Sequence, residues 1–340
     1  MVGADGVLPL PWLGDWLESA LRTQRGHAVL IHGPQGIGQW QLSLTLAQAW
    51  LCDAAAVARR PCGTCASCRL VQARSHPDLL VLLPEALQGP LGWTVGDAET
   101  DAPESGSKSR QPSKDIKVEA VRAAVAFAQT TPARAAGKVV VLHPAERMNG
   151  ISANALLKTL EEPAGTARFI LSSSAPQSLL PTIRSRCQAL GLPLPDPAQA
   201  TAWLAGQGVA SPEVVLAAAG GQPLDALDWV REGLDAKLWS RLPAIVAQGD
   251  AAPLAGWPIV RVVDALQKLC HDVLSVSVGA APRFFPPGSV TARPGTVPIS
   301  QWSRELLRAA RQAEHPLNAG LMIEALVSRG RLALMSPQGR

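Results

Sequence analysis

Residues 152–187 constrain the fold most, because signals for a helix, a stop, a strand and a second helix follow one another without a gap. Ser152 and Asn154 are good helix-capping residues, and a leucine-rich helical face follows them. The helix is expected to end at Pro163, because a proline ring clashes with the preceding turn. The run RFILSS at 168–173 is typical of a short buried strand. A second helix that starts with a proline, followed by Ser-Arg-Cys, completes a pattern that predicts an α/β fold.

A second strand runs into a glycine-rich loop and a helix near the start of the chain. The segment 28–32 is apolar, and the residues after it have the glycine spacing of a phosphate-binding P-loop, G-x-x-x-x-G-K-[ST]. The lysine position holds Gln39, which has no charge to set against a phosphate, and the Ser/Thr position holds Trp40, which cannot bind Mg²⁺. We therefore expect the loop to fold without a functional ATP site. Its three glycines are Gly33, Gly36 and Gly38.

Four of the six cysteines lie within seventeen residues, at Cys52, Cys62, Cys65 and Cys68. Two consecutive C-x-x-C steps and one upstream cysteine form a four-thiolate set, which suits tetrahedral Zn²⁺ in a closed, structural site. The alternatives are a group of buried free cysteines or a redox pair. His76 could be mistaken for a further ligand, but its place before a proline favours a turn or a packing role.

The segment NALLKTLEEP at 154–163, followed by Ser-Arg-Cys, resembles the bacterial clamp-loader family of AAA+ proteins. The resemblance implies an AAA+ P-loop-type domain with a parallel sheet at 1–193, which carries the zinc module at 52–68. It also implies a small helical lid at 194–234 and an all-α collar domain at 235–340. Separately, the Gly-, Pro- and Ser-rich composition of 84–113 predicts a flexible surface insertion.

The resemblance also implies that two further parts of an ATPase are missing. In AAA+ motors the central strand, here 139–142, ends in Asp-Glu, but His143 and Pro144 hold those positions. The lid of the family carries a nucleotide-sensing arginine, and Leu224 stands in its place. These substitutions agree with the loss of the lysine and Ser/Thr of the P-loop.

The family's Ser-Arg-Cys motif implies a role for Arg186, with Ser185 and Cys187 as its motif neighbours. In the family this arginine projects into the ATP site of an adjacent subunit as an arginine finger. An arginine brought in from outside stabilises the charge on the transferring phosphoryl group, and it makes hydrolysis depend on assembly. The alternative is an ordinary surface ion pair, which contributes about 0–1 kcal/mol to stability.

The expected function is therefore that of a non-hydrolysing clamp-loader subunit. The resemblance implies motor subunits of the gamma/tau type as partners in a five-subunit ring, with the sliding clamp and primed DNA reached through the complex. It makes the chain part of a DNA polymerase holoenzyme rather than an ATPase on its own. An active motor subunit of the same ring is the alternative, and equilibrium ATP binding would distinguish the two.

Composition bounds these expectations. A protein that binds nucleic acid on its own is a third interpretation of the sequence. The net charge of +4 over 340 residues is low for such a protein. No apolar run approaches the roughly 18 residues of a membrane span, and the first residues lack the features of a signal peptide. We therefore expect no membrane partner and a cytoplasmic location.

Overall fold

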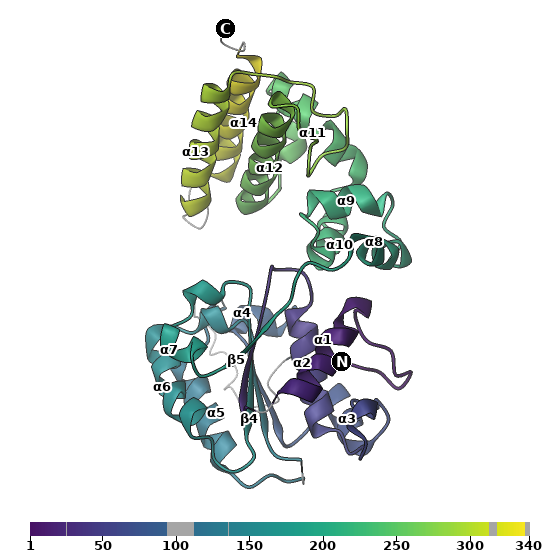
Figure 1. Ribbon diagram of the computed structural model, residues 1–340. Helices are drawn as coiled ribbons and strands as arrows, with labels where there is room; N and C mark the ends of the chain where they lie inside the picture. The colour runs from purple at the N-terminus through teal and green to yellow at the C-terminus, as the bar shows by residue number, and fades with distance from the viewer. Residues whose placement is uncertain (25, 94–111, 135, 313–317, 337–340) are drawn as a thin grey trace, which may run out of the picture. The chain divides into compact units, whose positions relative to one another are not determined.

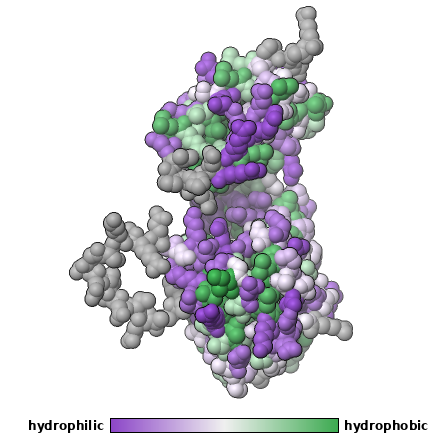
Figure 2. Space-filling view, turned by 90° about the vertical axis from the view of Figure 1, so that its left-hand side faces the viewer, coloured by the Kyte–Doolittle hydropathy of each residue, from purple (hydrophilic) through white to green (hydrophobic). Residues whose placement is uncertain are grey.

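The computed structural model describes residues 1–340 except 25, 94–111, 135, 313–317 and 337–340 (Figure 1). The chain forms two compact units, Met1–Pro195 and Asp196–Arg340. Within the described residues, no helix combines the length and the apolar composition that crossing a membrane requires. On the face drawn in Figure 2, hydrophilic residues lie among hydrophobic ones over both units.

A parallel sheet of five strands, in the order β2-β3-β4-β1-β5, lies at the centre of the described part of the first unit. The predicted parallel α/β sheet is thus confirmed, and the strands expected at 28–32, 139–142 and 168–173 have those bounds. The sequence patterns predicted no strand at the position of the last one, which follows directly after Cys187. The strands are β1 (Ala28–His32), β2 (Leu79–Leu82), β3 (Val139–Leu142), β4 (Arg168–Ser173) and β5 (Gln188–Gly191).

Helices cover both faces of this sheet, with α1 and α2 on one side and α5, α6 and α7 on the other (Figure 1). The α-helices of the unit are α1 (Gly14–Thr23), α2 (Gln39–Leu51), α3 (Ala66–Gln72), α4 (Glu85–Gln88), α5 (Val118–Gln129), α6 (Gly150–Glu161) and α7 (Pro181–Arg184). Short 3₁₀ turns are η1 (Pro11–Leu13), η2 (Val57–Arg59), η3 (Ala145–Arg147) and η4 (Pro176–Ser178).

Both faces of the central strands are buried, as expected of a parallel sheet with helices on each side. Leu142 and Phe169 pack in one cluster with residues of α5 and α6. Val141 and Ile170 alternate with them along the strands and are also fully buried, so they face the opposite side, where α2 packs. The strands therefore read as unbroken apolar runs rather than as alternating ones.

Helix α6 begins earlier than the sequence suggested. Its N-cap is Asn149, whose side chain accepts a hydrogen bond from the backbone N–H of Ser152 at 2.8 Å. The expectation that Ser152 and Asn154 cap the helix is therefore wrong, because both lie inside it. Ser152 is instead fully buried, and its hydroxyl donates to the carbonyl of Ile116. The helix ends at Glu161, before Pro163, as predicted.

The first part of the predicted insertion at 84–113 is folded. Residues 85–88 form α4, and the Trp93 side chain is buried within the first unit. Its ring meets the ring of Trp40 edge to face, with centroids 6.1 Å apart. The expectation of a flexible surface insertion therefore does not hold for 84–93, and residues 94–111 of the predicted insertion lie outside the described residues.

The second unit is helical and has two apolar clusters. One joins α8, α9 and α10 around Leu204 and Val215, and the other joins α11 to α14 around Trp239 and Trp302. The division into a lid at 194–234 and a collar at 235–340 stays a prediction. The helices are α8 (Pro197–Gly206), α9 (Pro212–Ala218), α10 (Pro223–Arg231), α11 (Ala236–Gln248), η5 (Ala252–Leu254), α12 (Ile259–Ser277), α13 (Thr296–Gln312) and α14 (Ala319–Met335).

Candidate functional site

The glycine loop after β1 adopts a turn that only small residues permit. Gly36 and Gly38 have φ values of +71° and +108°, in the left-handed region that other residues avoid. A Cβ atom at Gly33 would lie 2.3 Å from the carbonyl oxygen of Leu192, so this position has no room for a side chain. The backbone of the loop therefore has the turn expected from the sequence.

The two substituted side chains of the loop are engaged within the protein. Gln39 is buried, and its Nε2 atom donates hydrogen bonds to the carbonyls of Gly33, at 2.9 Å, and of Pro34. The buried indole of Trp40 lies over the imidazole of His143, with ring centroids 5.1 Å apart. Trp93 packs against the same indole. Where a P-loop presents a cation and a hydroxyl, this loop presents an amide and a packed aromatic ring.

His143 lies at the end of β3, where the resemblance implies a carboxylate. Its Nδ1 atom and the hydroxyl of Ser172 share a hydrogen bond of 2.8 Å. Burial lowers the pKa of His143 to about 4, so the ring is neutral at physiological pH. Glu146 lies two residues after Pro144, the second of the two positions where a carboxylate is expected. Its side chain accepts hydrogen bonds from the backbone and the hydroxyl of Ser174. Leu224 lies in the first turn of α10, in the second unit.

Arg186 follows α7 and is held by four hydrogen bonds. Its Nε atom donates to Oε1 of Glu161 at 2.6 Å, and Nη2 donates to the same oxygen. Nη1 donates to the carbonyl of Thr182 and to the hydroxyl of Ser185, at 2.8 and 3.4 Å. The Arg186 side chain keeps 30% of its surface exposed, so the guanidinium lies at the surface beside the carboxylate of Glu161.

The neighbours of Arg186 in its motif have different environments. Ser185 is exposed, and its hydroxyl also donates to the carbonyl of Thr182. Cys187 is buried in the apolar cluster between the sheet and α6, and this burial raises the pKa of its thiol to about 12. The thiol of Cys187 is therefore protonated at neutral pH and fills space in the core.

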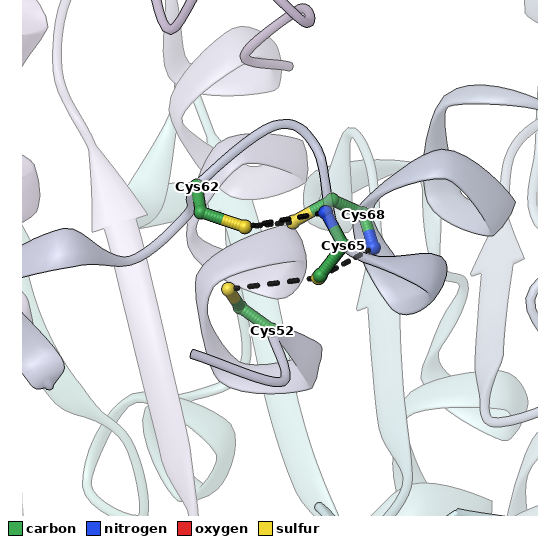
Figure 3. A group of neighbouring side chains, drawn as sticks. All are labelled: Cys52, Cys62, Cys65 and Cys68. Atoms are coloured by element: carbon green, nitrogen blue, oxygen red, sulfur yellow. Dashed lines mark hydrogen bonds between the residues drawn. The ribbon is translucent and has the colours of Figure 1, made fainter. Parts of the chain in front are cut away.

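The four clustered cysteines come together from two helices and a loop. Cys52 caps the C-terminal end of α2, Cys62 lies in the following loop, and Cys65 and Cys68 lie at the start of α3. Their sulfur atoms point toward one another (Figure 3) and all lie within 4.8 Å of each other. Sulfurs around tetrahedral zinc, bound at about 2.3 Å, are about 3.8 Å apart, so the cluster has the size of a metal site.

Backbone amides support this cluster. The N–H groups of Cys65 and Cys68 donate to the sulfurs of Cys62 and Cys65, at 3.4 and 3.3 Å. Hydrogen bonds from backbone N–H groups lower the pKa of Cys62 to about 6, while burial raises the pKa of Cys52 and Cys68. The tight turn needs Gly63, because a Cβ atom there would lie 1.9 Å from the carbonyl of Gly3.

Polar contacts around the cluster tie it to the rest of the unit. Asp53 accepts hydrogen bonds from the backbone and hydroxyl of Ser67, and it forms an ion pair with Arg134 at 3.3 Å. Gln72 donates to the carbonyls of Gly63 and Val2. His76 is buried, and its Nδ1 atom accepts a hydrogen bond from the backbone of Asp78. Among the described residues, the side chains grouped closely enough to hold a metal ion here are those of the four cysteines. The hydrogen bond between His76 and the backbone of Asp78 instead lies within the turn before β2.

Comparisons with known proteins converge on one family. The sequence profile described as "DNA polymerase III, delta subunit" matches residues 13–196. The chain is 40% identical over 215 residues to the DNA polymerase III subunit delta' of Pseudomonas aeruginosa, covering 62% of this chain and 58% of that relative. It is 31% identical over 280 residues to the subunit delta' of Escherichia coli, covering 76% of each chain. The matched part thus spans under two thirds of the Pseudomonas relative.

The fold has a solved counterpart. A crystal structure of a DNA polymerase III gamma subunit-related protein from Thermotoga maritima superposes with a TM-score of 0.52 at 17% identity. The superposition covers 94% of this chain and 99% of that one. At this level of identity the likeness concerns the fold, an AAA+ type of sheet domain followed by helices.

Proposed function

The chain belongs to the DNA polymerase III delta-prime subunit family, and from this we propose that it works as a non-hydrolysing subunit of a bacterial clamp loader. Its partners would be motor subunits of the gamma/tau type and a delta subunit, in a ring of five. Through that ring it would help to load the sliding clamp on primed DNA during chromosome replication in the cytoplasm. Part of the chain's role would be to complete the ATP site of a neighbour.

The observation that carries the proposal is the state of the glycine loop. Hydrolysis of ATP needs a cation at the β- and γ-phosphates and a side chain that binds Mg²⁺. Gln39 and Trp40 supply neither, and their side chains are already bonded or stacked within the protein. His143, neutral and hydrogen-bonded to Ser172, adds no carboxylate for Mg²⁺ or water. The loop of this chain thus has the backbone turn of a P-loop but lacks the side chains that hydrolysis of ATP requires.

Arg186 is the residue that we propose to act on a neighbour. It is partly exposed, it lies at the end of a short helix, and its guanidinium has the planar set of donors that matches phosphoryl oxygens. Placed at the γ-phosphate of an adjacent ATP, it would stabilise the charge that develops on transfer. It would do so only when the two subunits are assembled.

Zinc is the metal that we propose for the four cysteines. When bound, it would supply structure rather than catalysis, because four thiolates fill its coordination shell. Cys52 would connect the metal to the end of the P-loop helix, and Cys65 and Cys68 would connect it to α3. The module would thereby fix α3 against α2.

The test compares the isolated chain with the reconstituted complex. We expect the purified chain to show no ATP binding at millimolar concentrations by calorimetry. In the ring formed with gamma/tau and delta subunits, Arg186→Ala should lower DNA-stimulated ATP turnover on the order of 10³-fold at the site it completes, with assembly unchanged. Arg122→Ala, an exposed arginine on α5, is the matched control and should leave turnover unchanged. ATP turnover by the isolated chain, or full turnover with Arg186→Ala, would overturn the proposal.

A further inference from the structure

A pocket of about 440 Å³ opens beside α7, between the edge of the sheet and the turn that follows β4. Its polar side chains are His32, Arg184 and Ser185. Its apolar lining comes from β1, β5 and two prolines, through Leu30, Ala189, Pro176 and Pro181. A volume of this size admits one large side chain with part of its backbone.

The two arginines that flank Ser185 differ in their contacts. Arg186 uses four of the five N–H donors of its guanidinium on Glu161, Thr182 and Ser185. Arg184 is exposed, and its side chain has no hydrogen bond or ion pair to any residue in the described part of the chain. Its guanidinium is therefore free to bind a group from outside.

The lining of the pocket selects a particular anion. No carboxylate lines it among the described residues, and Arg184 is its one permanently charged side chain there. One carboxylate matches one guanidinium in charge, whereas a phosphate would bring a charge of about −1.5 to −2. The apolar walls suit the methylene groups of a glutamate side chain, which an inorganic ion lacks.

The strand that borders the pocket is open on its outer side. β5 lies at the edge of the sheet and pairs with β1, and no other described strand pairs with it. The N–H of Leu192 donates to the carbonyl of His32, so the backbone groups of Ala189 and Gly191, which alternate with it, point away from β1. Both residues are exposed. An extended segment could therefore pair with this edge, with alternate side chains reaching the pocket.

We propose that β5 and the pocket bind an extended segment of a neighbouring protein chain, with a glutamate side chain in the pocket against Arg184. The main chain of the segment would pair with Ala189 and Gly191, and Arg184 would supply the specificity for an acidic residue. The inference rests on the proposed function in one respect: it takes the bound segment to belong to a neighbouring subunit of the ring. It assigns Arg184 to recognition and leaves phosphoryl chemistry to Arg186.

Blocked tripeptides test the chemistry of the pocket on the full chain. We expect acetyl-Val-Glu-Val-amide, at millimolar concentration, to shift the NMR signals of the Ala189 and Gly191 amides and of the His32 ring. The isosteric acetyl-Val-Gln-Val-amide and inorganic phosphate should leave them unmoved. Arg184→Gln should abolish the shifts, while Arg122→Gln, the same charge change on α5, should preserve them. Because the side chain of Arg184 has no hydrogen-bond or ion-pair partner among the described residues, its variant should keep the wild-type melting temperature.

Equal shifts with the glutamine peptide would overturn the role of Arg184, and shifts with phosphate alone would overturn the carboxylate assignment. Reconstitution then separates this inference from the proposed function. Arg184→Glu should weaken incorporation into the ring by about tenfold or more and leave turnover per assembled complex unchanged. Arg186→Ala should lower turnover per assembled complex and leave incorporation into the ring unchanged. Normal incorporation of Arg184→Glu would overturn the docking role while leaving the proposed role of Arg186 intact.

Discussion

Glu161 binds Arg186 through a single carboxylate oxygen, Oε1, which accepts hydrogen bonds from both Nε and Nη2. The two side chains keep 48% and 30% of their surface exposed, so water screens the pair. Exposed ion pairs of this kind contribute about 0–1 kcal/mol to stability, so an anion that binds the guanidinium more strongly can displace the Glu161 carboxylate. A phosphoryl group on a neighbour could therefore replace Glu161, and the unassembled chain keeps its arginine paired until then.

This relationship predicts the effect of Glu161→Gln in the reconstituted complex. The amide oxygen keeps a hydrogen bond to Arg186 but removes the negative charge, so the guanidinium is released more easily. Basal ATP turnover, measured without DNA, should rise by about two- to fivefold, the range that up to about 1 kcal/mol allows. Glu162→Gln, the same change one residue along, should have no effect. A fall in turnover like that of Arg186→Ala would instead mean that Glu161 orients the arginine during catalysis.

Restoring the P-loop residues should return nucleotide binding without hydrolysis. In Gln39→Lys/Trp40→Thr, the lysine supplies the missing cation and the threonine a ligand for Mg²⁺. Calorimetry should detect MgATP binding by this variant and none by the wild-type chain. Turnover should stay absent, because His143 and Pro144 provide no carboxylate. Gln41→Lys, two residues along the same helix, is the control for added charge and should not bind.

The same variant should be less stable. Trp40 is buried against His143 and Trp93, and its truncation leaves a cavity between them. Losing a buried aromatic side chain costs about 3–5 kcal/mol. The melting temperature of Gln39→Lys/Trp40→Thr should therefore fall by several degrees, and saturating MgATP should recover part of that fall. An unchanged melting temperature would contradict the packing role of Trp40.

Zinc content tests the cysteine cluster. Elemental analysis of protein purified without chelator should give one zinc per chain. Cys65→Ala should lose the metal, because three thiolates do not close the site. Cys270→Ala, which removes a buried cysteine in the second unit, should retain it. Retention of a full equivalent by Cys65→Ala, or a zinc content near zero in the wild type, would contradict the proposal.

Removal of the metal should also loosen a defined part of the first unit. The cluster connects the end of α2 with α3, and Gln72 connects α3 with the carbonyls of Gly63 and Val2. After chelation, hydrogen exchange should therefore accelerate at the amides of 62–72 and of Val2. The amides of β3, in the centre of the sheet, should keep their protection. Equal acceleration throughout the unit would mean that the metal holds the whole fold rather than this module.

The strands and the cysteine cluster were predictable because their signals are local. β1, β3 and β4 each contain a run of at least three consecutive buried apolar residues, and these runs mark the strands in the sequence. Three of the four cysteines follow one another at three-residue steps, and Cys52, at the end of α2, lies beside them. Both features can therefore be recognised from a short stretch of sequence, even though distant segments contact them in the fold.

Other features depended on such contacts and were missed. β5 contains Gln188, Ala189 and Gly191, which have low strand propensity, and it becomes a strand only by pairing with β1. Trp93 lies in a segment of loop-like composition, yet Trp40 and Arg74 provide a place for its ring. The pairing of Arg186 with Glu161, 25 residues away, follows from how α6 meets α7 and has no signal in the sequence.

Asp225 makes the stability of the second unit depend on pH. Burial, with Asp228 and Asp264 nearby, raises the pKa of this carboxyl from 3.8 to about 6, and Lys268 and Arg261 offset part of the rise. Since the folded-state pKa lies above the unfolded value, the proton stabilises the fold below pH 4. That contribution is lost as the pH rises through 6. At pH 8 the ionised carboxylate is therefore a net cost to folding.

The variant Asp225→Asn removes this titration while keeping the shape of the side chain. It should raise the free energy of unfolding at pH 8 by an amount on the order of 1–2 kcal/mol, and the melting temperature with it, and it should have a much smaller effect at pH 4, near the unfolded-state pKa. Asp228→Asn, which removes an exposed carboxylate paired with Arg231 at 3.6 Å, should raise the melting temperature at pH 8 by less, because burial rather than the charge of Asp228 is the largest cause of the raised pKa of Asp225. Scanning calorimetry of the three proteins at both pH values measures the difference. Destabilisation of Asp225→Asn at pH 8 would mean that the attraction of Lys268 and Arg261 outweighs the burial of the charge.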